Sequence, residues 1–357
     1  MLTFRSLAVT VLLAATSVLA QQPQPLNVAP VPHDPLELAN GPVQVAETPQ
    51  ARSAAIDLLQ KANQNADLRT PGTAPWTLRA SFNASGPVLY TGSGEMEETW
   101  LAPDTLRWSV RVSDFSLTRT IFHGAAFDDR AIAFIPMRVH MLRDALFWPI
   151  TVELRPLIRT ATANWKGKEV TCILLSGPQA EATPTPGRRW YEKEYCIDPK
   201  SGLLQVWSEA PGIFVLYDYD DAAVFHGHIM PRAISIVEGG NQVLGARVES
   251  FGASVTSPDS FKPTQRAVAQ GPMLSAAMRF PQVVRVAPGA WAIQPVIVHA
   301  ILDEEGKVLD AELVENTGEA LSKSALDIVK RGSYLPSRDR RGPLQREAFI
   351  NVRFVSQ

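Results

Sequence analysis

The sequence has few features that would indicate nucleic-acid binding or a fibrous or disordered chain. Its 34 basic residues nearly balance 36 acidic ones over 357 residues, for a net charge of −2. A phosphate-binding surface requires clustered basic residues, so no nucleic acid is expected as a partner. With 45% hydrophobic and 20% charged residues, the chain has the composition of a globular protein, and its length favours about two domains.

Catalytic motifs are also missing. The sequence contains no Gly-x-Ser-x-Gly elbow, phosphate-binding loop, dinucleotide fingerprint or His-Glu-x-x-His motif. His226 and His228 would lie on one strand face and could supply two metal ligands, but a site would need a third ligand from elsewhere. We therefore expect no catalytic, cofactor-binding or metal-binding residues, and predict that the protein is not an enzyme.

Long apolar runs are confined to the N-terminus. Residues 1–20 carry one positive charge, an apolar run from Leu7 and a small-residue ending before Gln21, which is the pattern of a secretory signal peptide. The run would span about 21 Å as a helix, less than the roughly 30 Å core of a membrane. We predict cleavage and export; an uncleaved signal that anchors the chain in the inner membrane is the alternative.

Cysteine is scarce, with two residues in the chain, Cys172 and Cys196. In an oxidising compartment an even number of cysteines favours a disulfide. Each cysteine lies in a strand-like run, and a hairpin across the Pro/Gly-rich loop between the runs would bring the sulfurs together. We predict this disulfide; the alternative is two buried small hydrophobic residues.

Proline, with 28 residues, divides the chain. Seven prolines make residues 21–50 an extended linker. Residues 51–255 begin with an amphipathic helix and continue as short alternating strands, which predicts an open, curved antiparallel sheet, a half-barrel with helices. Residues 256–272 form a second linker, and residues 273–357 contain a small β-β-α-β domain. The predicted fold class is therefore α+β.

The C-terminal part resembles a known family. The stretch Pro295–Gly318, with its Asp-Glu-Glu-Gly-Lys-Val turn, and the helix and Tyr-Leu-Pro segment after it are similar to the TonB C-terminal domain. Gly332 departs from the family, which has tryptophan there, and should weaken the local aromatic packing. The fold-motif positions are the turn glycine, the helix-entry glycine, the helix alanine, and the aromatic residue and proline that follow: Gly306, Gly318, Ala325, Tyr334 and Pro336.

This resemblance implies a binding function. In that family an exposed sheet edge pairs with an extended segment of an outer-membrane receptor, through main-chain hydrogen bonds that need few signature side chains. The last strand, Glu347–Val355, is the expected edge; an interior strand, or one that pairs with itself in a dimer, is the alternative. The candidate binding residues alternate along it: Ala348, Ile350, Val352 and Phe354.

The middle of the chain resembles a second family. The run Gly94–Trp108 and the Asp-Pro-Lys-Ser-Gly-Leu hairpin after Cys196 are similar to LolA-like periplasmic lipoprotein carriers. That family is an incomplete barrel whose concave apolar face holds acyl chains beneath helices. The resemblance implies a candidate cavity, although the same side chains would also form an ordinary core. The candidate cavity residues are large and apolar: Trp100, Leu106, Trp108, Phe115, Phe122 and Phe134.

These observations together predict a periplasmic envelope protein. Its TonB-like module would bind a segment of an outer-membrane receptor or other envelope protein in a transport context. The alternative function is that of a periplasmic carrier, which would hold a lipid or a lipoprotein acyl chain in the N-terminal half-barrel.

Overall fold

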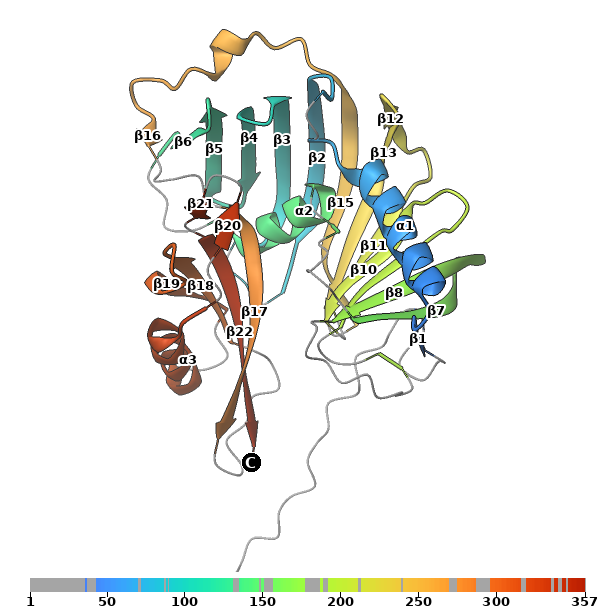
Figure 1. Ribbon diagram of the computed structural model, residues 1–357. Helices are drawn as coiled ribbons and strands as arrows, with labels where there is room; N and C mark the ends of the chain where they lie inside the picture. Colours follow the sequence, from blue (N-terminus) through green and yellow to red (C-terminus); the bar gives the residue numbers. More distant parts are fainter. Residues whose placement is uncertain are drawn as a thin grey trace, which may run out of the picture. The chain divides into compact units, whose positions relative to one another are not determined.

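The computed structural model describes residue 36 and, with gaps, residues 43–356 (Figure 1). The predicted signal peptide and most of the first linker lie outside the described residues. The gaps are at 70–71, 87, 89, 131–134, 148, 151–156, 177–186, 189–191, 211–212, 239, 270–274, 287–295, 316–318, 335–336, 340–341 and 345.

One open antiparallel sheet of 14 strands forms the N-terminal part, in the order β1-β7-β8-β9-β10-β11-β14-β15-β2-β3-β4-β5-β6-β16. Alternation of apolar and polar residues produces these strands: in β2 every second residue, from Trp76 to Ala84, is buried. The prediction of a large antiparallel sheet is confirmed. The strands are β1 (Gln44–Val45), β2 (Trp76–Ala84), β3 (Gly92–Ala102), β4 (Thr105–Val112), β5 (Phe115–Phe122), β6 (Ala125–Asp128), β7 (Leu157–Trp165), β8 (Lys168–Ser176), β9 (Lys193–Ile197), β10 (Leu204–Ala210), β11 (Ile213–Asp218), β14 (Ala233–Glu238), β15 (Asn241–Ala253) and β16 (Val268–Ala269).

Two helices, α1 (Pro49–Ala66) and α2 (Met137–Phe147), lie on the concave side of this sheet (Figure 1). Helix α1 begins where the Thr48 hydroxyl accepts a hydrogen bond from the Ala51 amide at 3.1 Å. It buries Ala55, Leu59 and Ala62 and is the predicted amphipathic helix. Helix α2 is buried on almost every side, and a helix buried all round shows no polar–apolar period in its sequence.

Smaller elements connect the main ones. Strands β12 (Ala223–Phe225) and β13 (His228–Met230) form a hairpin. The segment predicted as the second linker contains a 3-10 turn, η2 (Pro258–Phe261), and β16, which pairs with β6 at the edge of the large sheet. This part of the chain therefore contributes to the edge of the sheet.

The C-terminal part forms its own four-stranded sheet, in the order β17-β22-β18-β19. Its elements are β17 (Ser275–Val286), β18 (Val296–Leu302), β19 (Val308–Glu315), α3 (Glu319–Arg331) and β22 (Arg346–Ser356), with a small hairpin of β20 (Ser337–Asp339) and β21 (Gly342–Leu344). The predicted β-β-α-β order is confirmed as β18, β19, α3 and β22. Strand β17 was not predicted; it pairs parallel with β22.

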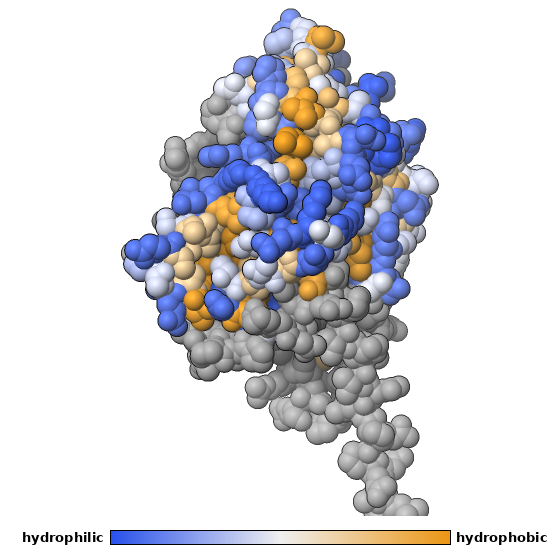
Figure 2. Space-filling view, turned by 90° about the vertical axis from the view of Figure 1, so that its right-hand side faces the viewer, coloured by the Kyte–Doolittle hydropathy of each residue, from blue (hydrophilic) through white to orange (hydrophobic). Residues whose placement is uncertain are grey.

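Among the described residues, none of the helices has the length and apolar character needed to span a membrane. Figure 2 shows one side of the molecule, on which hydrophilic residues lie between smaller hydrophobic areas.

Candidate functional site

The two cysteines form the predicted disulfide. Cys172 of β8 and Cys196 of β9 stand directly opposite each other in the antiparallel pair, and their sulfurs are bonded. The expected hairpin therefore brings them together, and the prediction is confirmed. Both residues are fully buried, in a small apolar cluster on the opposite face of the sheet from α1 and α2, together with Val170, Val206 and Phe214.

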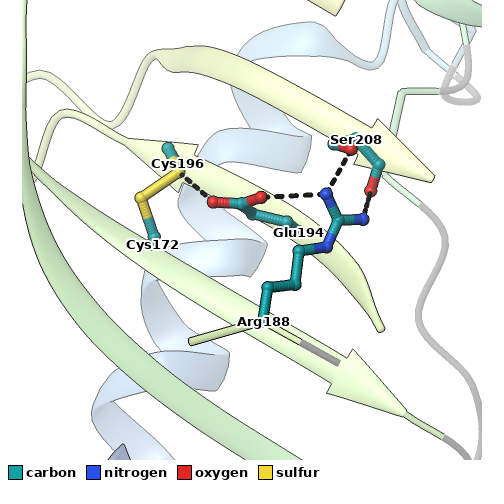
Figure 3. The surroundings of a disulfide bond; sticks show 5 residues. All are labelled: Cys172, Arg188, Glu194, Cys196 and Ser208. Atoms are coloured by element: carbon teal, nitrogen blue, oxygen red, sulfur yellow. Dashed lines mark hydrogen bonds and ion pairs between the residues drawn. A yellow bond between two sulfur atoms is a disulfide. The ribbon is translucent and has the colours of Figure 1, made fainter. Parts of the chain in front are cut away.

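Buried charges surround this disulfide (Figure 3). The Glu194 carboxylate lies 3.2 Å from the Cys196 sulfur and 3.1 Å from the Arg188 guanidinium. Arg188 also donates to the hydroxyl and, at 3.0 Å, to the carbonyl of Ser208 on β10. A buried charge is stable only when it is paired and hydrogen-bonded, and this network ties Arg188 to Glu194 of β9 and Ser208 of β10.

A second buried ion pair lies in the same region. Arg159 of β7 donates to both carboxylate oxygens of Glu192, at 2.9 and 3.0 Å, and to the Gly187 carbonyl at 2.8 Å. Neither side chain of the pair is exposed. Because solvent does not reach these groups, we assign the disulfide and both ion pairs a structural role.

Four of the candidate cavity residues belong to the buried core of the N-terminal sheet. Trp100, Leu106, Trp108 and Phe115 are all buried, Phe122 is partly exposed, and Phe134 lies outside the described residues. Two further rings complete the cluster: Trp76 packs against Trp100 and against Phe147 of α2, with ring centroids 6.3 and 5.7 Å apart. The four described buried residues thus pack as part of a core.

A charged cluster that the sequence did not reveal joins α2 to this core. The fully buried carboxylate of Glu98 on β3 accepts from Arg69 and, at 3.1 Å, from Arg143 of α2. The Arg143 guanidinium lies 4.1 Å from the centre of the Trp108 ring. Burial lowers the pKa of Arg69 to about 10, with a further contribution from Arg143 that Glu98 opposes. Two cations and one anion therefore meet beside the tryptophan core.

Two of the fold-motif residues of the C-terminal part, Gly306 and Tyr334, meet at one turn. Gly306 has a φ of +83°, and its carbonyl accepts a 2.8 Å hydrogen bond from the Tyr334 amide. The Asp303 carboxylate accepts from the amides of Glu305 and Lys307 at 2.9 and 2.8 Å. The turn that carries the resemblance is thus tied to the residues after α3.

The remaining motif positions divide into described and undescribed ones. Ala325 is fully buried on α3, in a cluster with residues of β18 and β22, whereas Gly318 and Pro336 lie outside the described residues. A side chain at Gly332 would meet the Tyr334 hydroxyl, since an ideal Cβ there would be 2.8 Å from it. The tyrosine ring lies where a larger residue at Gly332 would have to fit.

Replacing Gly306 by alanine should destabilise the C-terminal part by about 1 kcal/mol, because a residue with a Cβ is strained at positive φ. Urea unfolding, followed by hydrogen exchange of residues 296–315, measures the change. Gly252 offers a matched control, since it lies in a strand without positive φ and a Cβ there would meet nothing within 4 Å. An equal loss in both variants would contradict the role of the turn.

The predicted binding edge is wrong. Strand β22 pairs antiparallel with β18 on one side and parallel with β17 on the other, so it is an interior strand. The candidate residues Ala348, Ile350, Val352 and Phe354 are buried in the core of the module. The physical reason is β17, whose pairing occupies the edge that the sequence left open. In the described sheet the outer strands are β17 and β19.

The histidine pair is also placed differently from the expectation. His226 has a φ of +49° and precedes Gly227 in the turn of the β12–β13 hairpin, so the two imidazoles do not share a strand face. Within the described residues, no third acidic, histidine or cysteine side chain joins them in a group close enough to hold a metal. The group formed by Cys172, Glu194 and Cys196 is close enough, but both sulfurs are bonded in the disulfide.

Comparison with protein families identifies the C-terminal module. Residues 295–355 match the family model described as Gram-negative bacterial TonB protein C-terminal. This segment is similar to TonB C-terminal domains. The match contains β18, β19, α3 and nearly all of β22, and it begins after β17. The resemblance predicted from the sequence is confirmed, and with the disulfide it indicates an envelope protein.

Comparison with solved structures finds similar chains at low sequence identity. A LolA superfamily protein from Nitrosomonas europaea is similar at 9% identity and a TM-score of 0.40, over 58% of this chain and 97% of that one. An outer membrane lipoprotein-sorting protein domain from Vibrio parahaemolyticus has 6% identity and a TM-score of 0.36 over the same shares. MucB in complex with MucA(peri) has 11% identity and a TM-score of 0.25, over 61% of this chain and 62% of that one. No curated protein matches the chain.

Proposed function

We propose that this protein is a non-catalytic, exported envelope protein whose TonB C-terminal domain binds an extended segment of an outer-membrane receptor, or of another envelope protein, in a transport context. Binding by strand addition takes its affinity from main-chain hydrogen bonds. It therefore requires a sheet edge that accepts an extended chain and needs no catalytic or metal-binding side chains.

The observation that carries this proposal is the pairing at β22. The edge of this strand accepts an extended segment over nearly its whole length, from Arg346, opposite Ser275, to Ser356, opposite Val286. That segment, β17, lies outside the residues that match the family. The matched domain therefore has an edge able to hold a strand that is not its own.

The test uses synthetic peptides that correspond to periplasmic segments of outer-membrane receptors from the same envelope. We expect at least one labelled peptide to bind the full chain saturably in fluorescence anisotropy. A peptide of the same sequence with every second amide N-methylated keeps its side chains but loses main-chain donors, and should not bind. Equal binding of the methylated and unmethylated peptides would contradict strand addition.

A second function, carriage of a lipid or lipoprotein acyl chain, is supported by the concave face of the N-terminal sheet. That face is apolar and rich in tryptophan, and α2 lies over it, attached to the sheet by hydrogen bonds and ion pairs. One such attachment is the Tyr217 hydroxyl of β11, which donates to the Ala145 carbonyl at 3.0 Å. Movement of α2 would expose Trp76, Trp100 and Trp108.

Native mass spectrometry tests this second function on the full chain, purified from its own envelope without detergent. A carrier should retain an acyl lipid as a defined added mass, and Tyr217→Phe should change the retained amount by loosening α2. A chain that carries no added mass, either as purified or after incubation with envelope lipids, would contradict this function.

A further inference from the structure

We propose that β17 is an internal occupant of the partner-binding edge of the TonB C-terminal domain, and that an incoming segment must displace it. This inference rests on the proposed function and specifies where the partner binds and in which direction its chain runs. The partner would pair with β22 in parallel, as β17 does.

The first support is that the residues that match the family do not include β17. The family match begins at residue 295, whereas β17 ends at Val286. Buried residues of β18, β19, α3 and β22 pack together in the core of the domain. Its buried members are Val296, Val298, Ala300, Leu302, Ala311, Ala325, Val329, Ala348, Ile350, Val352 and Phe354. Removing β17 would leave the β22–β18 and β18–β19 pairs in place.

The second support is the weakness of the β17 pairing. Strand β17 is an outer strand whose described pairing is with β22 alone, and parallel pairing is slightly less stable per residue than antiparallel pairing. It contains Pro281, opposite Asn351, and a proline removes a main-chain donor and is confined to outer strands or bulges. The register also shifts between Ser275 and Met278. A strand with these features can be replaced on β22 by another extended segment.

The charges of the two strands indicate the chemistry of the partner. Strand β17 carries Arg279 and Arg285 and no acidic residue, and β22 carries Arg346, Arg353 and Glu347. Arg285 lies opposite Val355, two positions from Arg353, whereas Arg279 lies opposite Phe349, two positions from Glu347. Diagonal neighbours on paired strands are within reach of long side chains, and like charges across a strand pair are destabilising. An extended segment with an acidic residue at the position of Arg285 would therefore pair with β22 better than β17 does.

The experiment measures uptake of a labelled peptide with the sequence of residues 275–286 by the full chain. In the double variant Val283→Pro/Val284→Pro, two successive prolines remove main-chain donors on both sides of β17. Strand β17 should then no longer pair with β22, which leaves the edge of β22 free. We expect this variant to bind the labelled peptide saturably, with one peptide per chain. Binding to the unmodified chain should be about tenfold weaker or more, because only the open fraction is competent to bind.

Two matched reagents sharpen this test. The variant Val308→Pro/Leu309→Pro makes the same change in β19, the other outer strand, and should not take up the peptide. A peptide with Arg285→Glu should bind the opened chain about threefold more tightly than the original at low salt. Hydrogen exchange of residues 296–315 reports whether the C-terminal part of each variant is folded.

A locked form keeps the inference testable if the proline variant does not fold. Val283 and Arg353 are register partners, so Val283→Cys/Arg353→Cys can be oxidised to hold β17 on β22. We expect the oxidised form to bind neither the 275–286 peptide nor a receptor segment, and mild reduction to restore both. Equal binding before and after oxidation, or no uptake by a folded proline variant, would overturn the inference.

The outcomes also separate this inference from the proposed function. A receptor segment that binds the locked and unlocked forms equally would leave the proposed function standing and refute displacement of β17. If the opened variant takes up the 275–286 peptide but no form binds a receptor segment, internal occupancy would hold and the proposed function would fail.

Discussion

Replacing Glu192 by glutamine should lower the free energy of unfolding of the N-terminal sheet by about 3–5 kcal/mol. The substitution is nearly isosteric, but it removes the carboxylate that accepts from the Arg159 guanidinium, at a place where neither side chain of the pair is exposed. Urea unfolding followed by tryptophan fluorescence measures the loss. Most of the tryptophans lie in this part of the chain, at positions 76, 100, 108, 148, 165, 190 and 207.

The matched control is an exposed ion pair on the same sheet. Arg79 and Glu97 approach to 2.6 Å, but their side chains are 65% and 40% exposed, and exposed pairs contribute about 0–1 kcal/mol. Glu97→Gln should therefore have little effect. The double variant Arg159→Met/Glu192→Met should recover much of the stability, because it removes both buried charges together. Equal losses for Glu97→Gln and Glu192→Gln would contradict the buried pairing.

Removing the disulfide should have the second-largest effect. The bond joins residues separated by 24 positions, and closing a loop of this length stabilises a protein by about 3 kcal/mol in the chain-entropy model. The double variant Cys172→Ala/Cys196→Ala should unfold at correspondingly lower urea concentration, and the unmodified chain treated with reductant should behave similarly. The disulfide also contacts Glu194, so some loss will come from repacking.

A control distinguishes the bond from the packing. The oxidised and reduced forms of the unmodified chain have the same atoms except for the two thiol hydrogens, so their difference in stability isolates the cross-link. An oxidised chain that unfolds at the same urea concentration as the reduced chain would contradict a stabilising role for the disulfide.

Features with a local chemical signature were predictable from the sequence. The alternation in segments such as Trp76–Ala84 specifies strands because successive side chains in a strand point to opposite faces. The disulfide followed from two cysteines in neighbouring strand-like runs. Gly306 and Tyr334 followed from the family resemblance, and the structure joins them by a hydrogen bond.

Features that depend on distant partners were not predictable. The sequence shows Glu98, Glu192 and Glu194 as ordinary charged residues, and their burial becomes favourable only because Arg69, Arg159 and Arg188 approach them in the fold. Helix α2 lacks a period because it is buried on nearly all sides. The nearest signal was a charged residue followed by buried ones in the same strand, as at Glu194 before Tyr195 and Cys196.

The error at β22 has a similar cause. Its alternating sequence correctly predicts a strand, but whether a strand is an edge depends on what pairs with it. The pairing segment, β17, contains Pro281 and Arg279 without a clear alternation, so its own sequence does not indicate a strand. The domain boundaries at 51–255 and 273–357 and the candidate cavity stay predictions.

Hydrogen–deuterium exchange on the full chain tests the central proposal, segment binding by the TonB C-terminal domain, most directly. The exchange is compared with and without a receptor segment that binds. The account predicts that the segment increases exchange in residues 275–286, keeps 346–356 protected, and leaves the strands of the large sheet unchanged. If the segment changed the exchange of residues 92–112 and not that of residues 275–356, the proposal would be contradicted.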